Sequence, residues 1–199
     1  MNTSKFLTAA LLGCAALLAG CKDSPSPAAP SSSAGKGSET VSVAAVAAEA
    51  KGFTVGSEMS VRRVFVFFDP QCPHCAELWV AARPLKSQAR FIWIPVGLMN
   101  EASTAQGAAI LGAPDPVAAM DQHEASMRAK QGGLTAAGDL KEQRAAVAAN
   151  TQLMNRYGFA SIPTIVANHA QTGALVVKEG GTSTAGLAQL LGLQMPAGN

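Results

Sequence analysis

The chain is poor in charged residues and in cysteine. Only 14% of its 199 residues are charged, and the net charge is +2. It contains no run of basic or acidic residues, which excludes a chain built to bind nucleic acid or another strongly charged partner. The hydrophobic share of 48% excludes a disordered chain. No internal repeat is present, and the length suits one domain with a sizeable core.

The apolar run near the start is too short for a comfortable membrane span. It covers residues 6–20 and follows the positive Lys5, a pattern typical of a signal peptide. The run ends in Leu18-Ala19-Gly20-Cys21, which resembles the bacterial lipobox. This resemblance implies a lipoprotein signal peptide over residues 1–20 and lipid on Cys21. An ordinary signal peptide, cleaved near Ala28 or Ala29, is the alternative.

The four cysteines divide by position. Cys14 lies in the leader, and Cys21 is the expected lipidation site. Residues 21–40 are rich in Ser, Pro, Ala and Gly and are expected to form a flexible tether to the membrane. The globular domain is expected over residues 41–199. It keeps only Cys72 and Cys75, and a single dithiol in an exported protein favours redox chemistry over a disulfide framework.

The two remaining cysteines frame the motif Cys72-Pro73-His74-Cys75. A run of β-branched and aromatic residues over 61–68 predicts a buried strand just before the motif. Apolar residues at helical spacing over 75–85 predict a helix just after it. Pro73 suits the first turn of that helix. Pro84 is expected to kink it.

This arrangement predicts different roles for the two thiols. Cys72 is expected at the helix N-cap, where free N–H groups favour an exposed, acidic nucleophile. Cys75, one turn further and on the apolar face, is expected to be the resolving thiol. His74 adds a second donor near Cys72, and Glu77 is placed to pair with it. Stabilising the reduced dithiol in this way makes the disulfide an oxidant.

The remaining pattern predicts an α/β domain. A short element at 41–49 is left open between helix and strand. Strands are expected at 53–59, 90–96, 164–167 and 175–178, and helices at 102–111, 115–129, 139–157 and 184–191. The order strand, CxxC, helix, strand, helices, hairpin, helix is that of the thioredoxin-like fold, with a helical insertion at 97–158.

Three stretches resemble the DsbC/DsbG family of periplasmic thiol-disulfide proteins. They are residues 67–75 with 82–84, residues 109–116 and residues 122–126. The resemblance implies a thiol:disulfide oxidoreductase that exchanges disulfides with exported proteins. It implies no cofactor beyond the redox-active Cys72–Cys75 disulfide, and a membrane redox partner that recycles the dithiol. We expect the protein in the periplasm, lipid-anchored to the inner or outer membrane.

The sequence departs from that family in three ways. The segment before the domain leaves no room for the family's N-terminal dimerisation domain, so a monomer is expected. The Pro73-His74 dipeptide resembles that of DsbA, an oxidase. Ile162-Pro163-Thr164 is similar to the thioredoxin motif around its cis-proline. The resemblance makes these three residues the expected substrate-binding loop opposite the dithiol.

Several other interpretations remain open. The direction of electron flow is unsettled, and a tethered reductase serving cytochrome c maturation is the alternative enzyme. A copper chaperone or client-binding module is the non-enzymatic alternative, although two sulfurs make only half of a tetrahedral metal site. We interpret His123 and His169 as solvated residues. Asp69 is assigned a capping or ion-pairing role. Val66 occupies the place of the buried carboxylate of thioredoxin and DsbA, so no proton relay is expected there.

Overall fold

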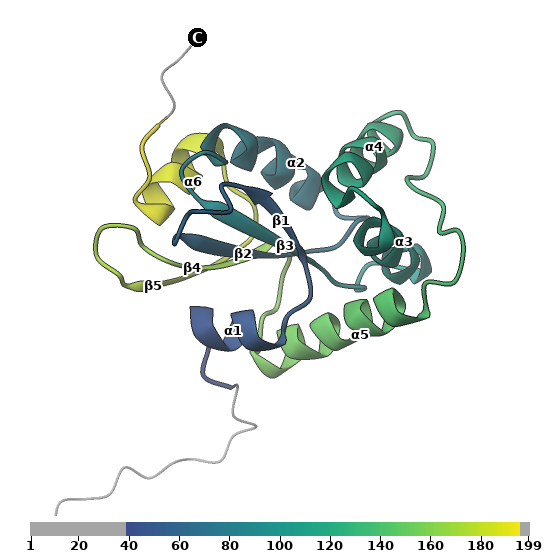
Figure 1. Ribbon diagram of the computed structural model, residues 1–199, viewed down its shortest axis with the longest axis horizontal. Helices are drawn as coiled ribbons and strands as arrows, with labels where there is room; N and C mark the ends of the chain where they lie inside the picture. Colours follow the sequence, from purple (N-terminus) through teal and green to yellow (C-terminus); the bar gives the residue numbers. More distant parts are fainter. Residues whose placement is uncertain (1–38, 196–199) are drawn as a thin grey trace, which may run out of the picture. The chain divides into compact units, whose positions relative to one another are not determined.

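The computed structural model describes residues 39–195, and the expected leader, Cys21 and most of the tether lie outside these residues. A five-stranded sheet forms the centre (Figure 1). Its strands are β1 (Phe53–Gly56), β2 (Arg63–Phe68), β3 (Arg90–Pro95), β4 (Thr164–Asn168) and β5 (Leu175–Glu179), in the order β1-β3-β2-β4-β5. Strands β2 and β3 are parallel, and the other neighbours are antiparallel. This confirms the expected thioredoxin-like order.

Strand β2 is central because both of its faces are apolar. Val64, Val66 and Phe68 contribute to one hydrophobic cluster, whereas Phe65 and Phe67 contribute to a second cluster on the opposite face. All five side chains are buried. The alternation follows from the two-residue period of a strand. One short strand therefore contributes to both hydrophobic clusters, and it ends a few residues before Cys72.

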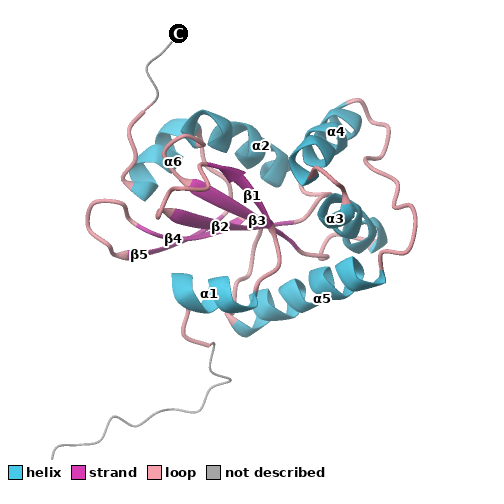
Figure 2. Ribbon diagram, in the orientation of Figure 1, coloured by secondary structure: helices cyan, strands magenta, loops and turns pink. Residues whose placement is uncertain are grey.

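Helices cover both faces of the sheet (Figure 2). On one face lie α2 (Pro73–Ala82), the 3-10 helix η1 (Arg83–Leu85) and α6 (Thr184–Leu191). On the other lie α1 (Val43–Glu49) and α5 (Lys141–Arg156). The undecided element near residue 45 is therefore a helix. Pro84 does more than kink the expected helix, because α2 ends at Ala82 and the chain continues as η1.

The expected helical insertion contains α3 (Glu101–Gly112), α4 (Pro116–Arg128) and α5. Asp115 caps α4 as predicted, because its carboxylate accepts hydrogen bonds from the N–H groups of Val117 and Ala118 at 3.0 Å. Asn100 caps α3 in a reciprocal pair with Ser103. Helices α3 and α4 lie beyond the ends of β2 and β3, so the insertion packs beside the turn that carries the CxxC motif (Figure 1).

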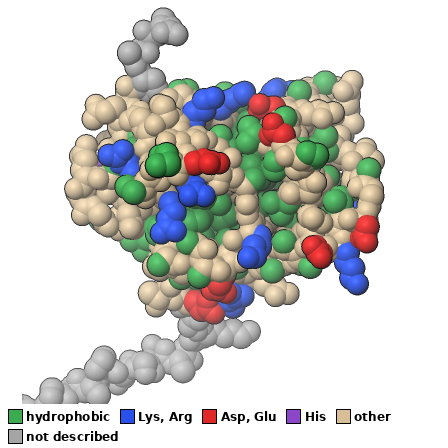
Figure 3. All heavy atoms as spheres, in the orientation of Figure 1, with side chains coloured by type: hydrophobic (Ala, Val, Ile, Leu, Met, Phe, Trp, Pro, Cys, Tyr) green, Lys and Arg blue, Asp and Glu red, His purple; other side chains and the backbone are tan. Residues whose placement is uncertain are grey.

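The surface agrees with the composition. Charged side chains of both signs are scattered over the face drawn in Figure 3, with apolar side chains between them. Across residues 39–195 no helix is both long enough and apolar enough to cross a membrane.

Candidate active site

Cys72 is the N-cap of α2, as the sequence predicts. Strand β2 ends at Phe68, and the turn closes with a hydrogen bond of 3.0 Å from the N–H of Cys72 to the carbonyl of Asp69. Cys72 keeps an extended backbone, with φ −91° and ψ 116°, and Pro73 then begins the helix. The side chain of Cys72 therefore sits at the amino end of a ten-residue helix, where unpaired N–H groups favour negative charge.

The two thiols are both free and differ in their surroundings. Cys75 is fully buried beside Leu78 and Trp79 on the apolar face of α2, as expected. Cys72 is less exposed than expected, because only 6% of its surface is accessible. The loop around residue 162 partly covers it, and the Cys72 Sγ lies 4.0 Å from the carbonyl oxygen of Ile162. Little of the Cys72 surface is therefore open to solvent.

The electrostatics separate the thiols further. A hydrogen bond from the Cys75 thiol lowers the pKa of Cys72 from 9.0 to about 6, against the opposing effect of burial. The backbone N–H groups of Cys75 and His74 and the charge of His74 add to this lowering. Burial raises the pKa of Cys75 well above its ordinary value, and the proximity of Cys72 adds to the rise. The arrangement thus holds a thiolate at residue 72 and a neutral thiol at residue 75.

His74 lies at the rim and contacts Glu77 as expected. Its Nδ1 is 3.1 Å from the Glu77 carboxylate, and both side chains are exposed. The hydrogen bond and the charge of Glu77 raise the pKa of His74. Glu77 therefore supports the cationic form of His74, and that cation in turn favours the Cys72 thiolate.

The loop predicted to bind substrate lies beside the dithiol. The Ile162–Pro163 peptide bond is cis, and the Ile162 carbonyl faces the Cys72 sulfur. Thr164 does not share this position. Its side chain is fully buried and donates a hydrogen bond to the Ser161 carbonyl, because Thr164 already belongs to β4 and pairs with Phe67 and Glu179. Among the three expected loop residues, Ile162, Pro163 and Thr164, it is Ile162 that remains partly exposed.

Asp69 links the CxxC turn to the start of the insertion. Its buried carboxylate accepts hydrogen bonds from the N–H groups of Gln71 at 2.8 Å, Leu98 at 2.7 Å and Met99 at 2.9 Å. The expected capping role is therefore correct, and the cap holds two loops together. Val66 is buried in the hydrophobic core, so the carboxylate nearest to the dithiol along β2 lies three residues before Cys72.

The interpretation of His123 as a solvated residue is wrong. Its side chain is fully buried. The Nδ1 atom accepts a hydrogen bond from the N–H of Leu134 at 3.2 Å, which leaves Nε2 to donate to the Pro70 carbonyl at 2.8 Å. His123 thus ties α4 to the CxxC turn. Sequence periodicity could not reveal this, because the contact joins residues 53 positions apart.

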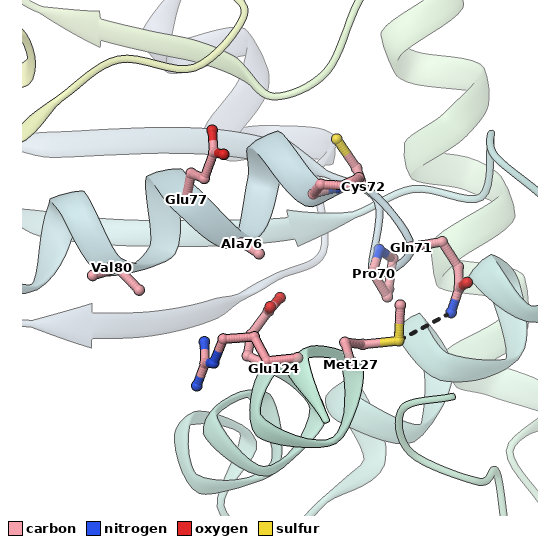
Figure 4. A pocket seen from close by; sticks show the side chains of 10 residues that line it. Pro70, Gln71, Cys72, Ala76, Glu77, Val80, Glu124 and Met127 are labelled. Atoms are coloured by element: carbon pink, nitrogen blue, oxygen red, sulfur yellow. Dashed lines mark hydrogen bonds between the residues drawn. The ribbon is translucent and has the colours of Figure 1, made fainter. Parts of the chain in front are cut away.

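A pocket of about 380 Å³ opens between α2 and α4 beside Cys72 (Figure 4). It is lined by Pro70, Gln71, Cys72, Pro73, Ala76, Glu77, Val80, Glu124, Met127 and Arg128. Glu124 is 2% exposed, and burial raises the pKa of its carboxyl group to about 7. Glu124 lies within residues 122–126, a stretch that carries the family resemblance, but the sequence assigns it no role and does not reveal its burial. Within residues 39–195 no three metal-binding side chains converge on one point.

Comparisons with known proteins found relatives in sequence and neighbours in fold. No family model matches the chain. The chain is 35% identical over 139 residues to the thiol:disulfide interchange protein DsbG of Pseudomonas aeruginosa. The match covers 66% of this chain and 51% of that protein. The chain therefore spans about half the length of this curated relative.

Solved structures share the fold. The catalytic domain of Proteus mirabilis ScsC superposes with a TM-score of 0.58 at 15% identity, over 75% of this chain and 96% of that domain. A periplasmic thioredoxin-like protein from Salmonella enterica serovar Typhimurium gives a TM-score of 0.54 at 16% identity, over 71% of this chain and 88% of that one.

The sheet order and the CxxC motif at the start of α2 define a thioredoxin-fold protein with a dithiol site. Within this class, the chain is similar in sequence to DsbG over the 139 residues that the comparison covers.

Proposed function

We propose that this protein is a thiol:disulfide oxidoreductase that exchanges disulfides with other polypeptides through Cys72 and Cys75. The observation that carries the proposal is the contrast between the two sulfurs. Cys72, with a pKa lowered to about 6, is the N-cap of α2 and faces the Ile162 carbonyl. Cys75 is neutral and buried directly behind it. The thiolate is the reactive form of a cysteine, so the arrangement supports an attacking and a resolving thiol.

The exchange proceeds in two steps. The Cys72 thiolate attacks one sulfur of a substrate disulfide, forming a bond between Cys72 and the substrate while the other substrate sulfur leaves as a thiolate. Cys75 then gives up its proton to the departing sulfur and attacks Cys72. The second substrate sulfur leaves as a thiolate that takes its proton from water, and the protein holds a disulfide between residues 72 and 75. The same steps in reverse oxidise a substrate dithiol.

The stabilised Cys72 thiolate favours the oxidising direction. A disulfide whose reduced form is stabilised accepts electrons readily, and the N–H groups and His74 act only on the reduced form. We therefore propose that the protein oxidises substrate thiols. A reduction potential above about −150 mV supports this direction, whereas a value near −270 mV, typical of thioredoxin, supports a reductase.

A turnover assay tests the proposal. A peptide with two cysteines is incubated in a glutathione redox buffer with the protein and with Cys72→Ser and Cys75→Ser variants. The protein is expected to accelerate disulfide exchange, and Cys72→Ser is expected to remove the acceleration completely. Unchanged exchange with Cys72→Ser would overturn the proposal.

We infer an exported location from the leader at 1–20, and a membrane anchor from lipid on Cys21. One neighbour in fold, from Salmonella enterica serovar Typhimurium, is a periplasmic protein, in keeping with this location. Incorporation of labelled fatty acid into the protein, lost in Cys21→Ser, tests the anchor. Recovery of the Cys21→Ser protein in the membrane fraction with equal labelling would contradict it.

A further inference from the structure

Helix α4 carries a carboxyl group that the disulfide exchange does not use. The Glu124 side chain is 2% exposed and points into the pocket beside Cys72 (Figure 4). Within residues 39–195 it makes no hydrogen bond and no ion pair closer than 4 Å. Burying a carboxyl group that makes no hydrogen bond destabilises a folded protein. The position of Glu124 therefore favours a role in binding rather than in the packing of α4.

The other charged groups around the pocket form no hydrogen bond or ion pair with Glu124, although the charge of Arg128 acts on it. Glu77 lines the same pocket, but its exposed carboxylate is engaged by His74 at 3.1 Å. Asp121, one turn before Glu124, is held by Arg83 at 3.0 Å. Arg128 follows one turn after Glu124 and is exposed to solvent. Glu124 is therefore the carboxyl group in this pocket that remains available for a ligand.

The rest of the pocket is apolar and belongs to two helices. Ala76 and Val80 of α2 line the side of the pocket opposite Glu124, and Met127 of α4 lies near Pro70, at the end next to Cys72 (Figure 4). Val80 is 51% exposed, although it is a large apolar residue. An apolar channel with one carboxyl group fits a side chain that has an aliphatic stem and a cationic head, as lysine and arginine do.

We propose that this pocket binds a lysine or arginine side chain of the substrate polypeptide, close in sequence to the cysteine that reacts with Cys72. The aliphatic stem lies along the apolar lining of the pocket, and the cationic head pairs with Glu124. This inference rests on the proposed function, because the pocket adjoins Cys72 and a bound substrate would pass over it. Glu124 is thus a residue that selects substrates, outside the exchange chemistry itself.

Pairing with Glu124 should make the preference for cationic substrates depend on pH. Burial raises the pKa of Glu124 to about 7, with smaller contributions from Cys72 and Asp121 in the same direction and an opposing one from Arg128. Glu77 also faces the pocket from α2. Since only the ionised carboxylate pairs with a cation, the preference for cationic substrates should rise between pH 6 and pH 8.

The test compares peptides that differ in one side chain. Each peptide carries one cysteine activated as a 2-thiopyridyl disulfide, with lysine, norleucine or glutamate placed in turn at each neighbouring position. The reduced Cys75→Ser protein attacks through Cys72, forms a mixed disulfide and releases 2-thiopyridone, which is followed by its absorbance. The ratio of lysine to norleucine rates isolates the pocket, because the ionisation of Cys72 affects both peptides equally.

At pH 8 and low salt, the lysine peptide is expected to react about fivefold faster than the norleucine peptide at one or more positions. Adding Glu124→Gln should bring this ratio to about one, whereas the matched control Glu142→Gln, at an exposed position on α5 outside the pocket, should keep it. The change to glutamine preserves the shape of the side chain and removes the charge.

A ratio near one without Glu124→Gln, or a fivefold ratio that survives Glu124→Gln, overturns this inference alone. A Cys72 that reacts with none of the peptides overturns the proposed function and this inference with it.

Discussion

Ionisation of Cys72 should make the stability of the reduced protein depend on pH. The pKa of this thiol falls from 9.0 to about 6 in the folded protein. A lowered pKa means that the stabilisation is complete above pH 9, decreases as the pH falls, and is lost below pH 6. At pH 7 it amounts to about 1.4 kcal/mol, and above pH 9 to about 4 kcal/mol.

The oxidised protein has no thiol at residue 72 and lacks this contribution. Between pH 5 and pH 7, the free energy of unfolding of the reduced protein should therefore rise by about 1.4 kcal/mol relative to that of the oxidised protein. For a two-electron couple, about 1.4 kcal/mol corresponds to about 30 mV. At pH 7 the reduction potential should therefore be about 30 mV more oxidising than that of the same dithiol with an unshifted Cys72 pKa. Urea unfolding of both forms across this range measures the difference, and thiolate absorbance measures the pKa.

Two variants of Cys75 test what lowers the pKa of Cys72. The hydrogen bond from the Cys75 thiol is the largest contribution to the lowered pKa. Cys75→Ala removes this donor, and the pKa of Cys72 should rise toward its ordinary value of 9.0. Cys75→Ser keeps a hydroxyl donor and should hold the pKa near its original value. An inflection above pH 8 in the unmodified protein, or equal values for the two variants, would refute this reasoning.

Three further predictions concern the residues around the dithiol. Asp69→Asn removes the charge that accepts three N–H groups, and urea unfolding should show a loss of about 2–4 kcal/mol; a loss below about 0.5 kcal/mol would argue against the cap. His123→Ala leaves the Pro70 carbonyl without its donor and should cost about 1–3 kcal/mol. Burial lowers the pKa of His123. The free energy of unfolding of the unmodified protein should therefore decrease as the pH falls below about 6.5, and it should decrease less steeply in His123→Ala. Equal slopes of unfolding free energy against pH would show that this imidazole is not buried. The pKa of Glu124 rises from 4.5 to about 7, so the free energy of unfolding should fall as the pH rises through this window, by at most about 3 kcal/mol. Glu124→Gln should flatten that fall in pH-dependent unfolding, and an unchanged curve would contradict the burial of the charge.

The sequence predicts the elements of the fold well because their signals are local. The alternation of Val and Phe over 64–68 and the pair Asp115-Pro116 each act within one strand or one helix end. These signals placed β2 and the start of α4 correctly. The choice between helix and strand near residue 45 could not be made from sequence, because alanine and valine in so short a segment suit both. Tertiary packing against β2 and β4 decides it.

In the candidate site too, local features could be predicted from the sequence and features set by tertiary packing could not. The motif itself places Cys72 at the N-cap and Cys75 on the apolar face, since both positions follow from helix geometry. The buried state of His123 and of Glu124 depends on how α4 packs against the CxxC turn, about fifty residues away along the chain. The same packing and the loop at 162 reduce the exposure of Cys72, which the motif alone overestimates.

The most direct test of the account is to identify the sulfur that joins the protein to a substrate. The Cys75→Ser variant, which lacks the resolving thiol, is expressed with its leader, and disulfide-linked adducts are isolated without reducing agent and mapped by mass spectrometry. The account predicts adducts joined through Cys72 and none in the Cys72→Ser control. A Cys75→Ser protein that forms no adduct, or adducts that persist in Cys72→Ser, would contradict it.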